Sequence, residues 1–177
     1  MKATGIVRRI DDLGRVVIPK EIRRTMRIRE GDPLEIYTSS SGEVIFKKYS
    51  PIGELSLFAT QYADALISAT DKAVIICDRD HCVAAAGISK KDVLDKRITP
   101  TVEEIMENRK VEVFGDGKAL PAVEGLEQNI SVAAPIVISG DVSGAVVFTS
   151  QSAKKPTDTD IKLAKVAASV LGKQMEA

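Results

Sequence analysis

Nine basic side chains crowd the first 29 residues of this 177-residue chain, and they are the groups best suited to chemistry. The same stretch carries three acidic residues, so its local net charge is +6. Arginine dominates, and its guanidinium stays charged and forms a planar fork that matches two phosphate oxygens or the O6/N7 edge of guanine. This chemistry predicts that the segment binds a polyanion. The arginines concerned are Arg8, Arg9, Arg15, Arg23, Arg24 and Arg27.

The formal net charge of zero hides a division along the chain. Residues 1–50 hold eleven Lys and Arg against seven Asp and Glu, a net of +4, while residues 51–177 hold fourteen against eighteen, a net of −4. No aromatic residue precedes Tyr37. Because single-stranded nucleic acid is usually held on stacked aromatic rings, we expect double-stranded DNA as the partner. RNA stays open as an alternative, since a basic surface alone does not distinguish the two backbones.

The mode of recognition follows from the residue types that are missing. Residues 1–50 contain no Asn, Gln or His, so no side chain there can form the bidentate pair of hydrogen bonds that identifies adenine. We therefore expect recognition through phosphate placement and DNA shape, with a degenerate target. The competing interpretation is an ordinary solvated surface in which the arginines pair with Asp11, Asp12 and Glu21. Three arginines within residues 23–27, with one acid before them, favour DNA binding.

Short elements must position these arginines. Strands are predicted at Thr4–Ile10 and Arg15–Ile18 around an acidic, glycine-containing turn, and Pro19 suits the first position of a helix. A hairpin is predicted from Leu34–Thr38 and Glu43–Lys48, which gives the order ββαββ. Fifty residues bury too little apolar surface to be secure alone, so we expect an obligate dimer.

A second domain is predicted from residue 51, which divides the chain into domains 1–50 and 51–177. Ser50 is a suitable N-cap and Pro51 a suitable first helical residue. Long amphipathic helices are predicted over Leu55–Ala69 and, after a Thr157–Asp160 capping box, over Ile161–Met175. With the strands between them, this order predicts an α+β domain whose antiparallel sheet carries helices on one face. The strands are Ala73–Cys77, Cys82–Ala86, Val111–Phe114, Ile130–Ile138 and Ser143–Ser150, and the shorter helices are Lys90–Leu94 and Val102–Asn108. Ser139-Gly140-Asp141 is predicted to be the turn of a hairpin that joins the last two strands.

The two long helices allow two interpretations. They can pack on the sheet as core helices, or they can pack between subunits, because their small alanines permit close helix approach. The predicted interface residues are Leu55, Phe58, Tyr62, Ala65, Ile161, Ala164, Ala168 and Leu171.

The run TGIVRRIDDLGRVVIP, residues 4–19, resembles the AbrB-type transition-state regulators, and the resemblance extends over residues 4–49. It implies a swapped-hairpin dimer that exchanges strands. It also implies DNA contacts from Arg8, Arg15, Arg23 and Arg24, with Arg9 at a position that is usually basic. Met26-Arg27 departs from the family's usual Leu-Gly, and an arginine at this position costs about 1 kcal/mol if the backbone is left-handed there. A different helix end and a phosphate contact from Arg27 are the two alternatives.

The remainder resembles a GAF sensor domain, through Ala134–Val137 and Ser143–Phe148. This implies a pocket for an unidentified small-molecule effector, with Arg97 and residues 115–118 as polar contacts, although Gly-Asp-Gly is also a common turn. Together the resemblances imply a cytoplasmic, nucleoid-associated bacterial transcription factor that activates and represses sporulation genes. They also imply that the tail helices join two head dimers into a tetramer. The runner-up is a small-molecule-sensing or antitoxin-type module that acts through protein partners.

Other chemistry finds little support. His81 is the single histidine, and with Cys77 and Cys82 it lacks the Cys-x-x-Cys spacing of a zinc site, so neither an enzyme nor a metal or cofactor is expected. A turn through residues 78–81 would place Cys77 opposite Cys82, which leaves a reversible disulfide and two unreactive thiols as alternatives. No apolar run approaches the length of a membrane span, and no secretory leader is recognisable.

Overall fold

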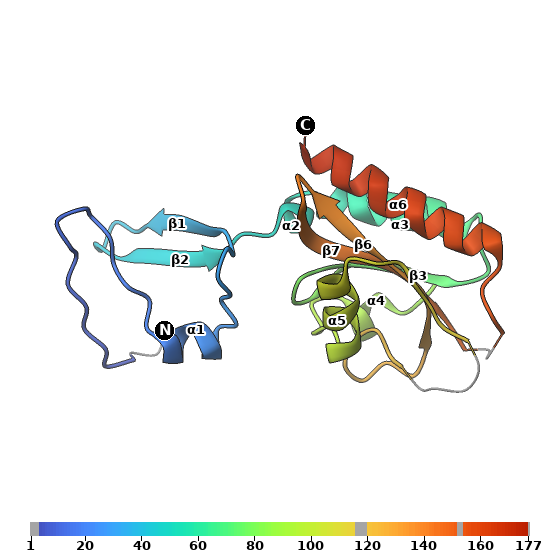
Figure 1. Cartoon of the computed structure of the whole chain (residues 1–177), viewed down its shortest axis with the longest axis horizontal. Helices are drawn as coiled ribbons and strands as arrows, with labels where there is room; N and C mark the ends of the chain where they lie inside the picture. Colours follow the sequence, from blue (N-terminus) through green and yellow to red (C-terminus); the bar gives the residue numbers. More distant parts are fainter. Residues whose placement is uncertain (1–3, 116–119, 152–153, 177) are drawn as a thin grey trace. The chain divides into compact units, whose positions relative to one another are not determined.

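A computed structural model describes residues 4–115, 120–151 and 154–176 of the chain. The chain divides into two compact units, residues 1–49, here called the head, and residues 50–177, here called the tail (Figure 1). Ser50 caps the first tail helix, α2 (Pro51–Glu54), because its hydroxyl accepts a hydrogen bond of 3.0 Å from the Gly53 amide. The predicted N-cap at Ser50 is thereby confirmed.

The head contains one short helix and one hairpin. Helix α1 (Lys20–Thr25) begins one residue later than predicted, because Pro19 is its N-cap and not its first helical residue. Strands β1 (Leu34–Thr38) and β2 (Val44–Lys48) pair antiparallel, as predicted. The strands predicted at residues 4–10 and 15–18 are not formed in the single chain. A strand needs a neighbour for its amide and carbonyl groups, and within one head the only ladder is that between β1 and β2 among the described residues.

The head lacks an apolar core of its own. Of the described residues 4–49, only Pro19 is buried. Large apolar side chains lie in solvent along the segments that form no strand: Val7 is 87% exposed, Ile10 72% and Val17 70%. A single head therefore leaves uncovered the side chains that normally drive folding.

The tail is built on a five-stranded antiparallel sheet with the order β4-β3-β7-β6-β5. The last two long strands form the predicted hairpin, which turns at Ser139 and Gly140, both with positive φ. The strand positions predicted from the sequence are confirmed, with small differences at their ends. The strands are β3 (Ala73–Asp78), β4 (Cys82–Ala86), β5 (Glu112–Val113), β6 (Asn129–Ile138) and β7 (Asp141–Ser150).

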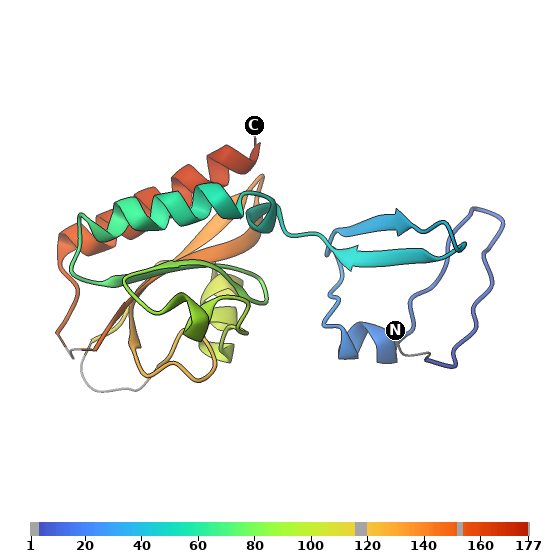
Figure 2. The ribbon, with the colours of Figure 1, turned by 180° about the vertical axis from the view of Figure 1, so that it is seen from behind.

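Helices cover both faces of this sheet, so the prediction of helices on one face is wrong. Helices α3 (Ser56–Ile67) and α6 (Asp158–Glu176) lie side by side over one face, while α4 (Lys90–Val93) and α5 (Pro100–Asn108) cover the other (Figures 1 and 2). Strand β3 shows the reason, because Val74 and Ile76 enter one core and Ile75 enters the other. Its uninterrupted apolar run is typical of a strand buried on both faces.

The long tail helices use their small residues to pack on the sheet. Ala164, Ala168 and Leu171 are at most 5% exposed and belong to the core between α6 and the sheet. A Cβ on Gly172 would lie 2.6 Å from the Val137 carbonyl oxygen, so the α6 backbone approaches β6 closely. The assignment of Ala164, Ala168 and Leu171 to an interface between copies is corrected, because side chains already buried in their own domain present no surface to another copy.

The helix predicted over Leu55–Ala69 is confirmed as α3, which begins at Ser56 and ends at Ile67. Leu55 separates it from the short helix α2. The buried residues of α3 are Ala59, Ala63 and Leu66, whereas Phe58 and Tyr62 pack at the margin of the core and Ala65 is exposed. Leu55, Phe58, Tyr62, Ala65 and Ile161 thus keep exposed or half-buried side chains.

Candidate nucleic-acid interface

The loop from Asp11 to Arg15 presents the first arginine of the site. The Asp11 amide donates to the Arg15 carbonyl (3.0 Å) and the Gly14 amide donates to the Asp11 carbonyl (3.0 Å), which closes a tight turn. Gly14 has a φ of +75°, a conformation that glycine adopts without strain. The Arg15 Nε donates to the Asp11 Oδ2 at 2.8 Å, and the Arg15 side chain is 70% exposed. The predicted alternative of arginine paired with Asp11 is therefore present at Arg15, yet the guanidinium stays accessible.

Helix α1 supplies two further arginines. Arg23 and Arg24 lie in its last turn, and both are exposed. The Arg23 Nε donates to the Ile18 carbonyl at 3.2 Å, which ties this side chain to the segment that precedes the helix. The positive side chains face the partial negative charge of the helix C-terminus, which stabilises them there.

Arg27, which follows the end of helix α1, has the left-handed backbone conformation that was considered for this position from the sequence. Arg27 has a φ of +50°, and the Ile28 amide donates to the Arg23 carbonyl at 2.8 Å across this end. The Lys48 Nζ donates to the Arg27 carbonyl at 2.9 Å and lies 3.6 Å from the Asp32 Oδ2. Lys48 thus joins β2 to the end of α1. This role of Lys48 and Asp32 is not predictable from the sequence, because their spacing gives no pattern that indicates contact.

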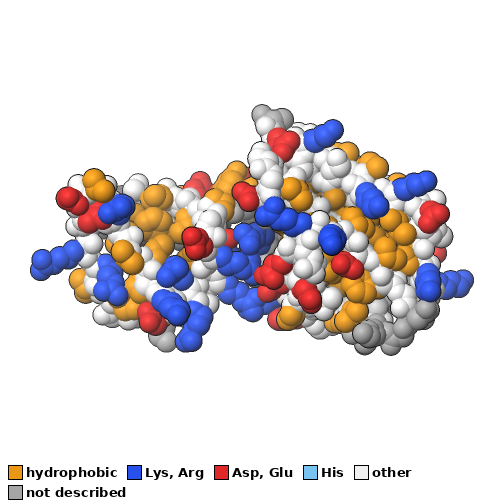
Figure 3. Space-filling view, viewed as in Figure 1, with side chains coloured by type: hydrophobic (Ala, Val, Ile, Leu, Met, Phe, Trp, Pro, Cys, Tyr) orange, Lys and Arg blue, Asp and Glu red, His pale blue; other side chains and the backbone are white. Residues whose placement is uncertain are grey.

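The remaining predicted arginines lie on the unpaired N-terminal segment. Arg8 and Arg9 are exposed and belong to the stretch that forms no strand in the single chain. The face of the head drawn in Figure 3 carries Lys and Arg side chains interspersed with apolar ones. The arginines are thus accessible to a polyanion, and apolar side chains of the same segments are exposed as well.

The two tail cysteines are adjacent and buried. Cys77 pairs with Cys82 across the β3–β4 ladder, beside a bulge, and each is 1% exposed. Burial, with the nearby Asp95 charge, raises the pKa of the Cys82 thiol to about 12, and burial likewise raises the pKa of Cys77. Neither thiol forms a disulfide. Because the thiolate is the reactive form, the geometry favours the alternative of two unreactive thiols.

No cluster of three His, Cys, Asp or Glu side chains suited to a metal ion occurs among residues 4–115, 120–151 and 154–176. His81 is exposed, and its amide donates to the Asp78 Oδ1 at 2.7 Å. Within the same ranges, no helix combines the length and the apolar character that crossing a bilayer requires.

The tail has an open cavity of about 380 Å³ between β6 and α6. Lys165 and Lys173 flank it, and Ala134, Pro135 and Val137 contribute apolar lining. Arg97 and Gly115, predicted as effector contacts, do not line this cavity. The other predicted contacts, Asp116 to Lys118, lie outside the described residues.

Comparison with known proteins identifies both parts of the chain. A family described as stage V sporulation protein T C-terminal, transcription factor, matches residues 54–176, and one described as antidote-toxin recognition MazE, bacterial antitoxin, matches residues 7–53. The chain is 52% identical over 178 residues to stage V sporulation protein T of Bacillus subtilis (strain 168), covering 99% of each protein. The chain belongs to the stage V sporulation protein T family.

The head and tail of this family member have separate relatives. The head is 61% identical over 51 residues to the transition state regulatory protein AbrB of Bacillus subtilis (strain 168), covering 29% of this chain and 52% of that protein. The N-terminal DNA recognition domain of AbrB has a solved structure, which covers 29% of this chain at 61% identity with a TM-score of 0.26. The predicted AbrB resemblance is confirmed, and the chain is a DNA-binding transcription regulator.

The tail shares its fold with GAF domains. The GAF domain of a phosphoenolpyruvate-protein phosphotransferase from Coxiella burnetii covers 71% of this chain, and 82% of that domain is covered, at 18% identity with a TM-score of 0.51. The predicted GAF-like fold is thereby confirmed.

Proposed function

We propose that this protein regulates sporulation genes, both as activator and as repressor, by binding double-stranded DNA through the arginines of paired heads. The single observation that carries the proposal is the accessible set of arginines on a head in which the described residues, 4–49, form no apolar core. The expected contacts are Arg8, Arg9, Arg15, Arg23, Arg24 and Arg27. The chain needs no cofactor and no catalytic group for this role.

Pairing of two heads follows from the exposed apolar segments. Val7, Ile10 and Val17 are at least 70% exposed, and their segments have no ladder partner in the single chain. Exchange of residues 4–10 and 15–18 between two heads would supply the missing strands and cover these side chains. Pairing also presents each arginine twice, which is the arrangement that a two-fold DNA site requires.

The tail is proposed to join two head dimers into a tetramer and to sense a small-molecule effector in the cytoplasm. Exposed apolar groups on its long helices support assembly: Leu57 is 72% exposed and Val166 55%. On α3, the half-buried Phe58 and Tyr62 stack with ring centroids 5.8 Å apart. Linking two head dimers would raise DNA affinity through a higher effective concentration.

The salt dependence of duplex binding by the full chain tests the DNA grip. If two copies of Arg8, Arg15, Arg23 and Arg24 each meet a phosphate, about eight counterions leave, and log K falls with log salt at a slope near about −7. Arg15→Ala and Arg23→Ala should each make the slope shallower by about 2, because each change removes two contacts. Lys162→Ala, an exposed cation on α6, is the matched control and should change it little. A wild-type slope shallower than about −3 would refute the proposed grip.

The match of residues 7–53 to an antitoxin family favours a second candidate, a module that acts mainly through a protein partner. The same titration separates the two functions. A protein of that kind would bind a duplex weakly, with a slope shallower than about −3 that Arg15→Ala leaves unchanged.

A further inference from the structure

The Asp11 carboxylate divides its two oxygens between the backbone of its own loop and the Arg15 side chain. Its Oδ1 accepts from the Leu13 amide (3.0 Å) and the Arg15 amide (2.8 Å), and its Oδ2 accepts from the Arg15 Nε (2.8 Å). Asp12, the next acid, is exposed and equal in charge. One carboxylate thus holds both the turn and the arginine that the turn presents.

This arrangement decides which edge of the guanidinium points outward. A guanidinium has five N–H donors, one on Nε and four on the terminal Nη atoms. Because Asp11 holds Nε, the terminal edge is left to approach a ligand, and a pair of parallel N–H groups on that edge is geometrically specific. The Arg15 side chain is 70% exposed and that of Asp11 37%, so the pair lies at the surface where a duplex would arrive.

A carboxylate at this place has a cost for DNA binding. It repels phosphate and neutralises part of the charge that attracts the duplex. A residue that served affinity alone would be better uncharged. The position of Asp11 therefore indicates that it improves specificity, that is, the discrimination between one duplex and another.

We propose that Asp11 is the positioning residue for Arg15, which it orients so that the head distinguishes one duplex geometry from another. This inference rests on the proposed DNA-binding function. Asp11 lowers the affinity for duplexes in general, and it raises the ratio of affinities between a preferred duplex and an arbitrary one.

Asp11→Asn in the full chain is the informative variant. An asparagine keeps an Oδ1 that accepts the Leu13 and Arg15 amides, and asparagine favours such turns. It replaces Oδ2 with an amide nitrogen, which is a donor and cannot accept from the Arg15 Nε. Asp12→Asn removes the same charge from the neighbouring position, and it is the matched control.

Two duplex probes give the discrimination ratio: a duplex that the full chain selects from a random pool, and poly(dI-dC). We expect Asp12→Asn to tighten binding to both alike and to leave the ratio unchanged. Asp11→Asn should tighten binding to poly(dI-dC) while it lowers the ratio about five- to tenfold. An unchanged ratio in Asp11→Asn would overturn the inference.

Repeating the change in an Arg15→Ala background separates positioning from a purely structural role. If Asp11 acts through Arg15, Asp11→Asn has no further effect on the ratio once Arg15 is absent. The same loss in both backgrounds would mean that Asp11 only shapes the turn, which overturns the inference. Wild-type binding of both probes by Arg15→Ala would instead refute the part of the proposed function that assigns a contact to Arg15.

Arg15→Lys keeps the test decisive if Asp11→Asn fails to fold. Lysine retains the positive charge but has no Nε and no planar fork. We expect it to lose discrimination to the same extent as Asp11→Asn while poly(dI-dC) binding persists. A ratio equal to that of the wild type would overturn the inference.

Discussion

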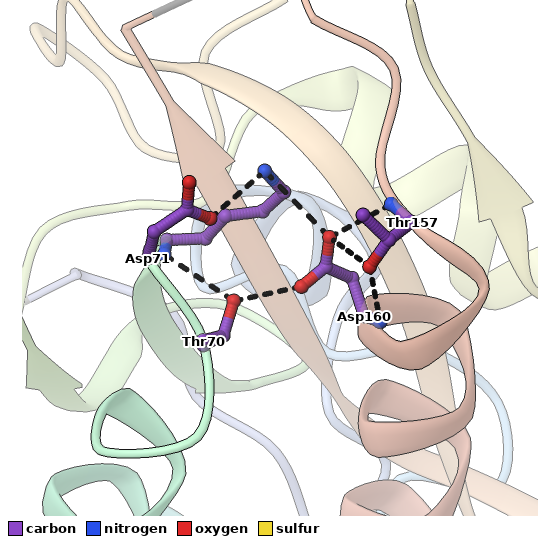
Figure 4. Close-up of polar contacts among 5 residues, drawn as sticks. Thr70, Asp71, Thr157 and Asp160 are labelled. Carbon is purple, nitrogen blue, oxygen red and sulfur yellow. Dashed lines mark hydrogen bonds and ion pairs between the residues drawn. The ribbon is translucent and has the colours of Figure 1, made fainter.

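Lys72 and Asp160 form an ion pair in the interior of the tail, with the Lys72 Nζ 3.7 Å from the Asp160 Oδ2 and each side chain only 6% exposed. The pair connects the segment before β3 to the first turn of α6 (Figure 4). Asp160 also accepts hydrogen bonds from Thr70 Oγ1 (2.8 Å) and from the Thr157 amide (2.8 Å). The predicted capping box is confirmed, because the Asp160 amide in turn donates to the Thr157 Oγ1 at 3.2 Å.

Removal of the Asp160 carboxylate should destabilise the tail strongly. Asp160→Ala removes the carboxylate that caps α6 and leaves the buried Lys72 with the exposed Asp71 carboxylate, 3.4 Å from its Nζ. Breaking a buried pair typically costs about 3–5 kcal/mol, and because the contact with Asp71 remains, the expected loss is at the lower end of that range. The free energy of unfolding of the tail, followed by circular dichroism in urea, measures this loss. Asp158→Ala removes an exposed carboxylate from the same turn and should cost much less. Equal losses for the two variants would show that the pair adds nothing beyond the charge of the turn.

The same carboxylate predicts how tail stability depends on pH. Burial alone would raise the pKa of Asp160, but the hydrogen bonds from Thr157 and Thr70 and the charge of Lys72 hold it below its ordinary value. Because the pKa of Asp160 is lowered in the folded state, its ionised carboxylate stabilises the tail fully above the ordinary aspartate pKa of about 3.9. This stabilisation is lost as the pH falls below that value. The difference in melting temperature between the wild type and Asp160→Asn should therefore be constant from pH 7 to 5 and shrink toward pH 3. A difference that grew on acidification would contradict the assigned direction.

An acidic residue among the exposed apolar side chains of the head should block pairing of heads. Val17→Asp places a charge where the proposed exchanged strands bury an apolar side chain, a change worth about 1.5–3 kcal/mol per copy before any cost of charge burial. Sedimentation velocity of the full chain should show a smaller assembly that retains the tail contacts. Ser41→Asp, in the exposed β1–β2 turn, is the control. A sedimentation coefficient that matched the wild type in both variants would argue against strand exchange.

Glycine at position 27 should stabilise the head. The φ of Arg27 is +50°, so Arg27→Gly relieves about 1 kcal/mol that Arg27→Ala does not relieve. Both variants lose the same side chain, and their difference in unfolding free energy isolates the backbone effect. If Arg27 contacts phosphate, both variants should also make the salt slope of DNA binding shallower by the same amount. Equal stability of the two variants would exclude a penalty at this position.

The cysteines should resist modification in the folded protein. Burial raises the pKa of Cys82 to about 12 and raises that of Cys77, so at pH 8 almost no thiolate is present and access is closed. A thiol-reactive chromogenic disulfide should release its product only after guanidinium is added, when both sites react. Rapid release of two equivalents from the native protein would contradict the buried arrangement.

Local elements of this protein could be predicted because their signals are local. Ser50 before Pro51 and the Thr157–Asp160 capping box mark helix starts through bonds made within one turn, and the structure confirms both. The β1–β2 and β6–β7 hairpins have turn residues between alternating or apolar runs, and they too form as predicted. The arginine cluster could be predicted for a similar reason, since residue types set the charge of the first 29 residues and their positions show the clustering.

Other features depended on long-range packing. Ala164 and Ala168 are equally suited to a sheet and to another helix, and only the position of α6 on β6 decided that they lie in the core. Placement of helices on both faces was likewise settled by how β3 divides Val74 and Ile75 between two cores. The pairing of Lys72 with Asp160 joins residues far apart in sequence, where no pattern of spacing predicts contact.

The sequence by itself determined the charge of the head, the caps and the hairpins, because a few neighbouring residues are enough to create each of them. Only the tertiary structure decided that residues 4–10 have no strand partner among the described residues of one chain, that both faces of the tail sheet are covered, and that Lys72 meets Asp160. The physical reason is that strand ladders, apolar cores and long-range ion pairs form only where segments distant in the sequence come into contact. Those contacts also decide which side chains are buried.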